Sequence, residues 1–134
     1  MNKILDTVQF KEFVQEIKQK IYSAKSKAIL SANKLMIELY FEIGKSIVEK
    51  QEALGWGKSV VEQMSRDLIN EFGEKSGYST QNLWYMRQFY LGYKDNLNLQ
   101  QLVGEIPWGS NILIFSRCKD DSEKEYYIKN TIEN

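Results

Sequence analysis

Residues 10–28 read FKEFVQEIKQKIYSAKSKA, and the spacing of their apolar side chains decides the fold class. These side chains follow one another at alternating steps of four and three residues. Such a seven-residue repeat is typical of a helix that packs along another helix. The sequence therefore predicts a helix here, with its apolar stripe formed by Phe10, Val14, Ile17, Ile21, Ala24 and Ala28.

The same helix is predicted to continue beyond residue 28. The stripe steps on to Ala32, Met36, Leu39, Ile43 and Ile47, and two successive steps of four shift it around the helix, as a stutter would. No proline occurs between residues 6 and 54. We therefore expect one long helix, or two helices in line with a bend near residues 23–26.

A helix with such a stripe needs a partner. Alanines at positions 24, 28 and 32 would let a second helix approach closely. One hypothesis is therefore an oligomerisation or protein-interaction module, in which the helix pairs with a copy of itself as a homodimer. The residues predicted to form this contact are Val14, Ile17, Ile21, Ala24, Ala28 and Ala32.

The composition supports an all-α fold in a single domain. The chain has 134 residues, 43% of them apolar, but only 8 glycines and 1 proline, fewer than the turns of a sheet protein usually need. The lone Cys118 cannot form an internal disulfide, the N-terminus lacks the apolar run of a signal peptide, and no apolar stretch is long enough for a membrane span. We expect a cytoplasmic protein with no membrane contact.

The rest of the chain divides into shorter helices. Gly55-Trp56-Gly57 ends the long helix, and a second helix is predicted over residues 58–72. Ser79 is a good N-cap for a third helix that covers about residues 80–91. The side chains expected to face inward are Val61, Met64, Leu68 and Phe72 in the second helix, and Leu83, Met86 and Tyr90 (or Phe89) in the third.

The C-terminal third gives weaker signals. Residues 93–104 carry no clear pattern, and Ile112-Leu113-Ile114-Phe115 suits a helix over 108–117 or a short buried strand, with helix the preferred interpretation. Residues 120–122 supply acids and a cap for a last helix over 123–133, with Tyr126 or Tyr127, Ile128 and Ile132 inward. That pattern stops at Asn134 without a terminating signal, so we expect the N-terminal fragment of a longer protein.

The sequence gives little support for catalysis. It has no histidine, which removes histidine-based triads and metal sites, and one cysteine is too few for a cysteine-based zinc site. No glycine-rich phosphate-binding motif occurs, and the acids of residues 120–125 lie at a helix start, where they offset the helix dipole. We expect no catalytic residue, no metal and no cofactor, and thus no enzyme activity in this chain alone.

Residues 58–91 are predicted to form a helix, a short turn and a capped helix, in the order and with the lengths typical of a helix-turn-helix unit. In such units the outward residues of the second helix meet DNA: glutamine pairs with adenine, arginine with guanine, and threonine, tyrosine or lysine with phosphates. Because the net charge is zero, any DNA contact must come from a local patch. The residues predicted to bind DNA are Lys75, Thr80, Gln81, Tyr85, Arg87 and Gln88, while Trp84 is either a core residue or a partner anchor.

Four segments resemble motifs of the bacterial YhcG family. ELYFEIGKSIV (38–48) resembles its LYWxIGkxIv segment, and YSTQNLWYMRQFY (78–90) is similar to its fSxxNLwxMRqFY signature. Gly57-Lys58, Leu68 and EFG (71–73) resemble yGkxxixxLsxDLxxeFG. IPWG (106–109) resembles lpWsh, with Gly109 in place of serine.

The resemblance implies the helical N-terminal domain of a two-part protein whose C-terminal domain is nuclease-like, of the PD-(D/E)xK type. That nuclease-like domain would be a partner in cis, and the present residues would bind DNA to target it. One departure weakens the expected phosphate attraction: Thr80 and Gln81 are neutral, where relatives are expected to be basic. The preferred hypothesis is a non-catalytic DNA-binding module, and the alternative is the oligomerisation module without DNA contact.

Overall fold

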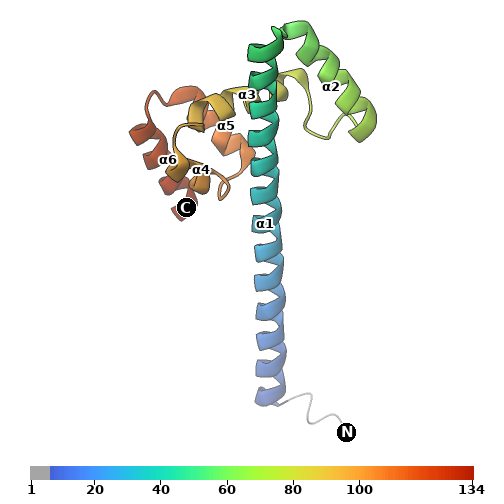
Figure 1. The fold of residues 1–134 in the computed structure, drawn as a ribbon. Coiled ribbons are helices and arrows are strands. Elements are labelled where there is room, and N and C mark those ends of the chain that lie inside the picture. Colours follow the sequence, from blue (N-terminus) through green and yellow to red (C-terminus); the bar gives the residue numbers. More distant parts are fainter. Residues whose placement is uncertain (1–6) are drawn as a thin grey trace. The chain divides into compact units, whose positions relative to one another are not determined.

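The computed structural model describes residues 7–134, and within this range every regular element is a helix (Figure 1). The fold class is therefore all-α, as the sequence predicts. The helices are α1 (Val8–Leu54), α2 (Lys58–Phe72), α3 (Thr80–Tyr93), α4 (Leu97–Val103), α5 (Trp108–Arg117) and α6 (Asp121–Glu133).

The long helix α1 is a single uninterrupted element, so the bend considered near residues 23–26 does not break it. Internal contacts nevertheless divide the chain into two units, Met1–Ala32 and Asn33–Asn134, and α1 crosses the division. In the first unit, the described residues 8–32 are all helical, and apolar side chains such as Ile17 and Ile21 are exposed. The described part of this unit therefore buries none of its own large side chains.

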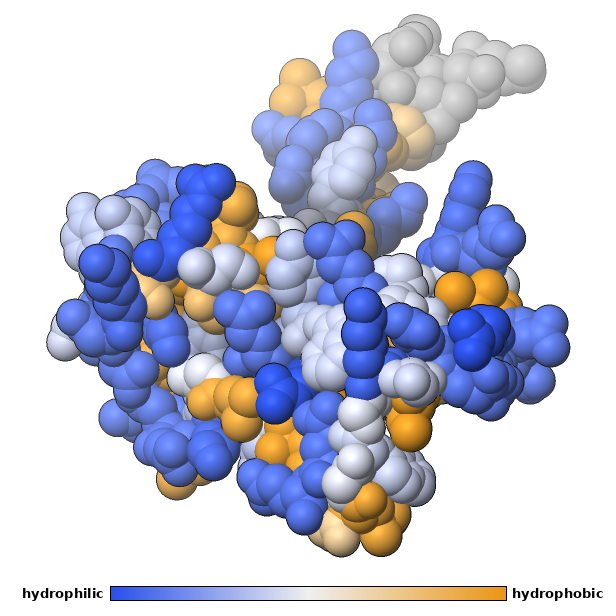
Figure 2. All heavy atoms as spheres, turned by 90° about the horizontal axis from the view of Figure 1, so that it is seen from above, coloured by the Kyte–Doolittle hydropathy of each residue, from blue (hydrophilic) through white to orange (hydrophobic). Residues whose placement is uncertain are grey.

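The second unit contains the hydrophobic core. The C-terminal part of α1 and α3 to α6 enclose one cluster around Phe89, which is fully buried. A second cluster joins α1, α2 and α3 through Leu83 and Met86. Helices α3 and α5 pack together, as do α5 and α6 (Figure 1). On the face drawn in Figure 2, hydrophobic residues form separate patches among hydrophilic ones.

The buried face of α1 includes Ile47, as predicted, but otherwise differs from the predicted stripe. Leu39 is predicted inward but is 46% exposed, and Met36 and Ile43 are only partly buried. Three buried positions, 37, 40 and 44, each lie one residue after the predicted positions 36, 39 and 43. The close approach of α3 to Gly44 decides that this face of α1 turns inward. The buried residues are Ile37, Tyr40, Gly44, Ile47 and Val48.

Helices α2 and α3 begin where the sequence predicts, and α3 is two residues longer. The Ser79 side chain caps α3 by accepting from the Asn82 backbone N–H at 3.1 Å. Of the two residues considered for the third inward position of α3, Phe89 is buried and Tyr90 is half-buried. Phe72 is predicted inward but is 61% exposed, since the last turn of α2 extends past the core and leaves its ring against Tyr78.

The stretch 93–104, for which the sequence carries no clear pattern, contains α4. The Asn96 side chain caps it by accepting from the Leu99 backbone N–H at 3.0 Å. Residues 112–115 are helical, in agreement with the preferred interpretation, because Ile114 and Phe115 point into the core while Leu113 is 54% exposed.

The last helix, α6, begins at Asp121 behind the Asp120 cap, but its predicted inner face is wrong except at Ile128. Tyr126, Tyr127 and Ile132 are exposed, at 65%, 45% and 36%. The second inward position belongs to Lys124, which the sequence analysis missed. Its ammonium donates to the Gly92 carbonyl at 3.1 Å and pairs with the Asp121 carboxylate at 3.7 Å, and these two contacts allow a charged side chain to be buried.

The ammonium of Lys124 also lies 5.0 Å from the centre of the Tyr93 ring. The Tyr93 hydroxyl is buried and has no hydrogen-bond partner among the described residues. Burial, together with the negative charges of Cys118 and Asp121 when ionised, raises the pKa of Tyr93 far above its ordinary value of 10.0. The folded state therefore disfavours the phenolate.

We expect Tyr93→Phe to raise the free energy of unfolding by about 1 kcal/mol at neutral pH, because it removes an unsatisfied buried hydroxyl. The contribution of Tyr93 to wild-type stability should be constant below about pH 10 and fall above it, since only the unfolded tyrosine then ionises readily. The variant should lose less stability over the same range. Urea titrations at about pH 8 and pH 11 would test this, and an equal alkaline loss in both proteins would contradict it.

Candidate nucleic-acid interface

The connection between α2 and α3 is held by side chains from three helices. The Ser65 hydroxyl of α2 donates to the Tyr78 carbonyl at 2.7 Å. At the start of α3, the Asn82 amide donates to the Gly77 carbonyl at 2.6 Å and accepts from the Trp108 indole N–H at 2.8 Å. These bonds fix where α3 begins relative to both α2 and α5.

Gly77 completes this turn. Its φ of +93° lies in the left-handed region that favours glycine, and a Cβ there would lie 2.9 Å from the Tyr40 hydroxyl. The turn therefore depends on a glycine at this position for both its backbone conformation and its packing.

Much of the sequence segment 78–90 is structural. Leu83, Met86 and Phe89 are fully buried, and Asn82 ties the turn to Trp108. Trp84 is half-buried against the second core cluster, as the packing interpretation expects. Only the positions between these residues are free to contact a ligand.

The six residues predicted to bind DNA are not all exposed. Lys75, Gln81 and Gln88 are exposed, and Thr80 is half-buried. Tyr85 is predicted outward, but it is half-buried with its ring 6.2 Å from that of Phe115, because α5 packs against this side of α3. Its hydroxyl nonetheless accepts from the Gln81 amide at 3.2 Å.

Arg87 is engaged within the fold. Its Nε donates to the Gln51 side chain of α1 at 2.6 Å, and its guanidinium lies 5.7 Å from the centre of the Trp84 ring. Arg87 therefore stabilises the fold through its contacts with the Gln51 amide and the Trp84 ring. We expect loss of the bond to Gln51 to cost about 1 kcal/mol.

The surface of α2 and its turn carries no excess of positive charge. Residues 58–75 hold three basic and four acidic side chains, and Lys58 pairs with Glu62 at 3.9 Å. In residues 76–93, Arg87 is the lone charged side chain. Any recognition by these helices would thus rely on hydrogen bonds more than on attraction of phosphates.

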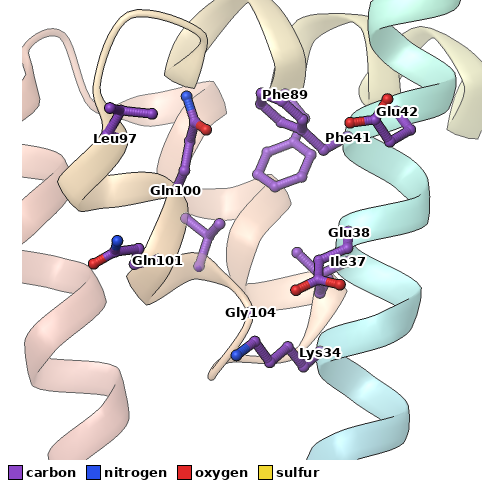
Figure 3. Close-up of a pocket in the computed structure, with 11 residues that line it drawn as sticks. Lys34, Ile37, Glu38, Phe41, Glu42, Phe89, Leu97, Gln100, Gln101 and Gly104 are labelled. Carbon is purple, nitrogen blue, oxygen red and sulfur yellow. The ribbon is translucent and has the colours of Figure 1, made fainter.

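The second unit also contains a groove of about 560 Å³ between α1 and α4 (Figure 3). Its floor is apolar, and Glu38 and Glu42 of α1 line one side while Gln100 and Gln101 of α4 line the other. The size suits a small ligand, and the lining also includes Lys34. Sequence reasoning missed this groove because it did not predict α4.

Within residues 7–134, no group of three or more histidine, cysteine, aspartate or glutamate side chains is arranged to hold a metal ion. In the same range, no helix has both the length and the apolar character needed to cross a membrane. The thiol of Cys118 has a pKa raised by burial and by the nearby Glu123, so it is not an activated nucleophile.

These observations describe an all-helical chain in which the polar start of α3 is held by the Ser79 cap and by Asn82. Over residues 16–134 the chain matches the DUF1016 N-terminal domain, and it belongs to that family. It is also 34% identical over 88 residues to a protein of Escherichia coli (strain K12) named "Putative nuclease YhcG". The resemblance to the YhcG family is thereby confirmed.

That match covers 63% of this chain but only 23% of the Escherichia coli protein. The matched part of the chain thus spans less than a quarter of the length of this relative. No solved structure matches the chain.

Proposed function

We propose that this domain is a non-catalytic DNA-binding module that targets a nuclease-like domain of the same longer protein. The observation that carries the proposal is the exposed polar start of α3, fixed in place by the Ser79 cap and by Asn82. The relative named as a nuclease supports nucleic acid as the partner. In this proposal α2, the turn and α3 form a helix-turn-helix unit.

The proposed contacts follow from side-chain chemistry. Gln81 and Gln88 are exposed and seven residues apart, so they lie on the same face of α3 about 10 Å from one another. A glutamine amide donates and accepts together, which suits the edge of adenine in the major groove. Lys75 and Thr80 lie nearer the turn and would contact phosphates.

This proposal differs from the sequence-based one in two side chains. Tyr85 and Arg87 are held by Phe115 and Gln51 and are assigned a supporting role. Lys75 is the one lysine among the residues proposed to contact DNA. Because few phosphates would be neutralised, we expect the affinity for DNA to depend only weakly on salt concentration.

The decisive variant is the double substitution Gln81→Ala and Gln88→Ala. If both amides contact bases, affinity for a selected duplex should fall by about 1–3 kcal/mol for each amide lost. The melting temperature should hardly change, because both side chains are exposed. Duplex selection from a random pool followed by fluorescence anisotropy would supply the affinities.

Gln101→Ala is the matched control, since this glutamine is exposed on α4 and lines the groove with α1. It should bind the selected duplex as wild type does. Selection that enriches no sequence, or equal affinity in the double variant and the control, would overturn the proposal.

A second candidate function is assembly through the first unit. Phe13, Ile17 and Ile21 are exposed there at 56%, 37% and 48%, which is unusual for a helix that acts alone. We propose this as an additional role, compatible with DNA binding through the second unit. Homodimerisation is one form of it, and association with another protein is the other.

A further inference from the structure

The first unit carries a narrow apolar seam between two rows of lysines. Assigned to a heptad abcdefg, Val14, Ile21 and Ala28 occupy a positions. Phe10, Ile17 and Ala24 then occupy d positions. Of the six flanking e and g positions, five hold exposed lysines and the sixth holds Phe13 at g: the lysines are Lys11, Lys18 and Lys25 at e, and Lys20 and Lys27 at g.

The acids of this segment lie away from the seam. Glu12 falls at f and Glu16 at c, and no acid occurs at any e or g position of residues 10–28. In the described part of the unit, the one ion pair of these lysines is Lys20 with Glu16, at 3.8 Å between side chains that are 70% and 64% exposed. The lysine rows are therefore available to pair across an interface.

A second copy of this helix is a poor occupant of the seam. In a parallel pair, a g position faces the next e position of the partner, which would bring Lys20 against Lys25. In an antiparallel pair, e faces e and g faces g, so lysine again meets lysine. Since like charges at these positions oppose association, self-pairing works against the charge pattern.

We propose that the seam of residues 10–28 binds an acidic amphipathic helix of another protein, with apolar side chains at a and d and carboxylates at e and g. Either orientation of such a helix places a carboxylate opposite every lysine of the two rows. The small Ala24 and Ala28 leave space for larger apolar side chains of that partner. This inference does not depend on DNA binding by α3.

The placement of the lysines favours a helix over other anionic surfaces. Contact of both lysine rows with DNA would press Ile17 and Ile21 against the charged phosphate backbone. Helices that lie on membranes usually present a broad apolar face, whereas this seam follows the a and d positions and is widened only by Phe13 at one g position. Tyr22 and Ile29 are exposed too, at 62% and 70%, but fall at b positions outside the seam.

The test uses the 134-residue chain and two labelled synthetic helices of four heptads, with leucine at a and d and either glutamate or lysine at e and g. Sedimentation at about 50 mM salt should show binding of the glutamate peptide and not of the lysine peptide. Binding should weaken at about 500 mM salt, where charges are screened. Ile17→Ser should reduce it strongly, and Tyr22→Ser should leave it unchanged.

A variant with reversed charges in the lysine rows tests whether these charges select the partner. The variant with Lys18, Lys20, Lys25 and Lys27 all changed to glutamate should lose affinity for the glutamate peptide on the order of 100-fold, because each reversal replaces an attraction with a repulsion. It should gain binding of the lysine peptide. Gln19→Glu with Ser26→Glu is the control, since both lie at f positions on the outer face.

Four outcomes would overturn the inference. The first two are equal binding of the two peptides and binding of neither. The third is a dimer of the chain at low salt that Ile17→Ser abolishes. The last is binding of duplex DNA or phosphatidylserine vesicles to the seam, lost in the charge-reversed variant, without binding of the glutamate peptide.

Discussion

Phe89→Ala is expected to lower the free energy of unfolding by about 3–5 kcal/mol, the usual cost of removing a fully buried aromatic ring. Phe89 is 0% exposed, and its ring contacts other aromatic rings from α1, α3 and α5. The centres of these rings lie 5.2–5.8 Å away, and the residues are Phe41, Tyr93, Trp108 and Phe115. A cavity at this point loosens three helices at once.

Phe72→Ala is the matched control, because the Phe72 ring is 61% exposed at the end of α2. It should cost less than about 1 kcal/mol. Urea denaturation followed by circular dichroism measures both values on helices of the same protein. Equal losses would show that Phe89 is not the centre of the core.

Gly44→Ala is expected to cost about 3 kcal/mol or more, although alanine normally favours a helix. A Cβ at position 44 would lie 2.0 Å from the Met86 carbonyl oxygen and 2.6 Å from its carbonyl carbon. Backbone cannot yield as a flexible side chain would, so α1 and α3 must separate. The second core cluster, which these helices share, would then be exposed.

Gly109→Ala provides the comparison, since Gly109 is also helical but a Cβ added there would meet no atom within 4 Å. It should be neutral or raise the free energy of unfolding by up to about 1 kcal/mol. Thermal melts of the two variants at equal concentration should show a large loss for the first and no loss for the second. A tolerated Gly44→Ala would mean that α1 and α3 do not approach closely at this point.

The helices themselves are well predicted because their signals are local. The seven-residue repeat indicates α1, Gly55-Trp56-Gly57 marks its end, and the Ser79 cap marks the start of α3. The segment 93–104 carries no such signal, since α4 has only seven residues, too few to show a period. Its helix depends on the Asn96 cap and on burial of Leu99 and Val103.

The candidate site is predicted only in part. Exposure of Gln81 and Gln88 follows from the helical period of α3, and the sequence locates both. Periodicity cannot show that α5 covers Tyr85 or that Gln51, 36 residues earlier in the chain, accepts from Arg87. Such contacts join elements that are distant in sequence, and no local pattern encodes them.

By itself, then, the sequence determined the helical class, the bounds of most helices and the charge pattern of residues 10–28, because period, capping and composition act over a few residues. The tertiary structure alone decided which face of α1 turns inward and which side chains cover or bind the residues of α3 and α6. Gly44 allows α3 to approach α1, Asn82 binds the Trp108 indole, and Lys124 is buried against Gly92. The physical reason is that close packing and the pairing of buried polar groups are properties of surfaces that meet only after the chain has folded.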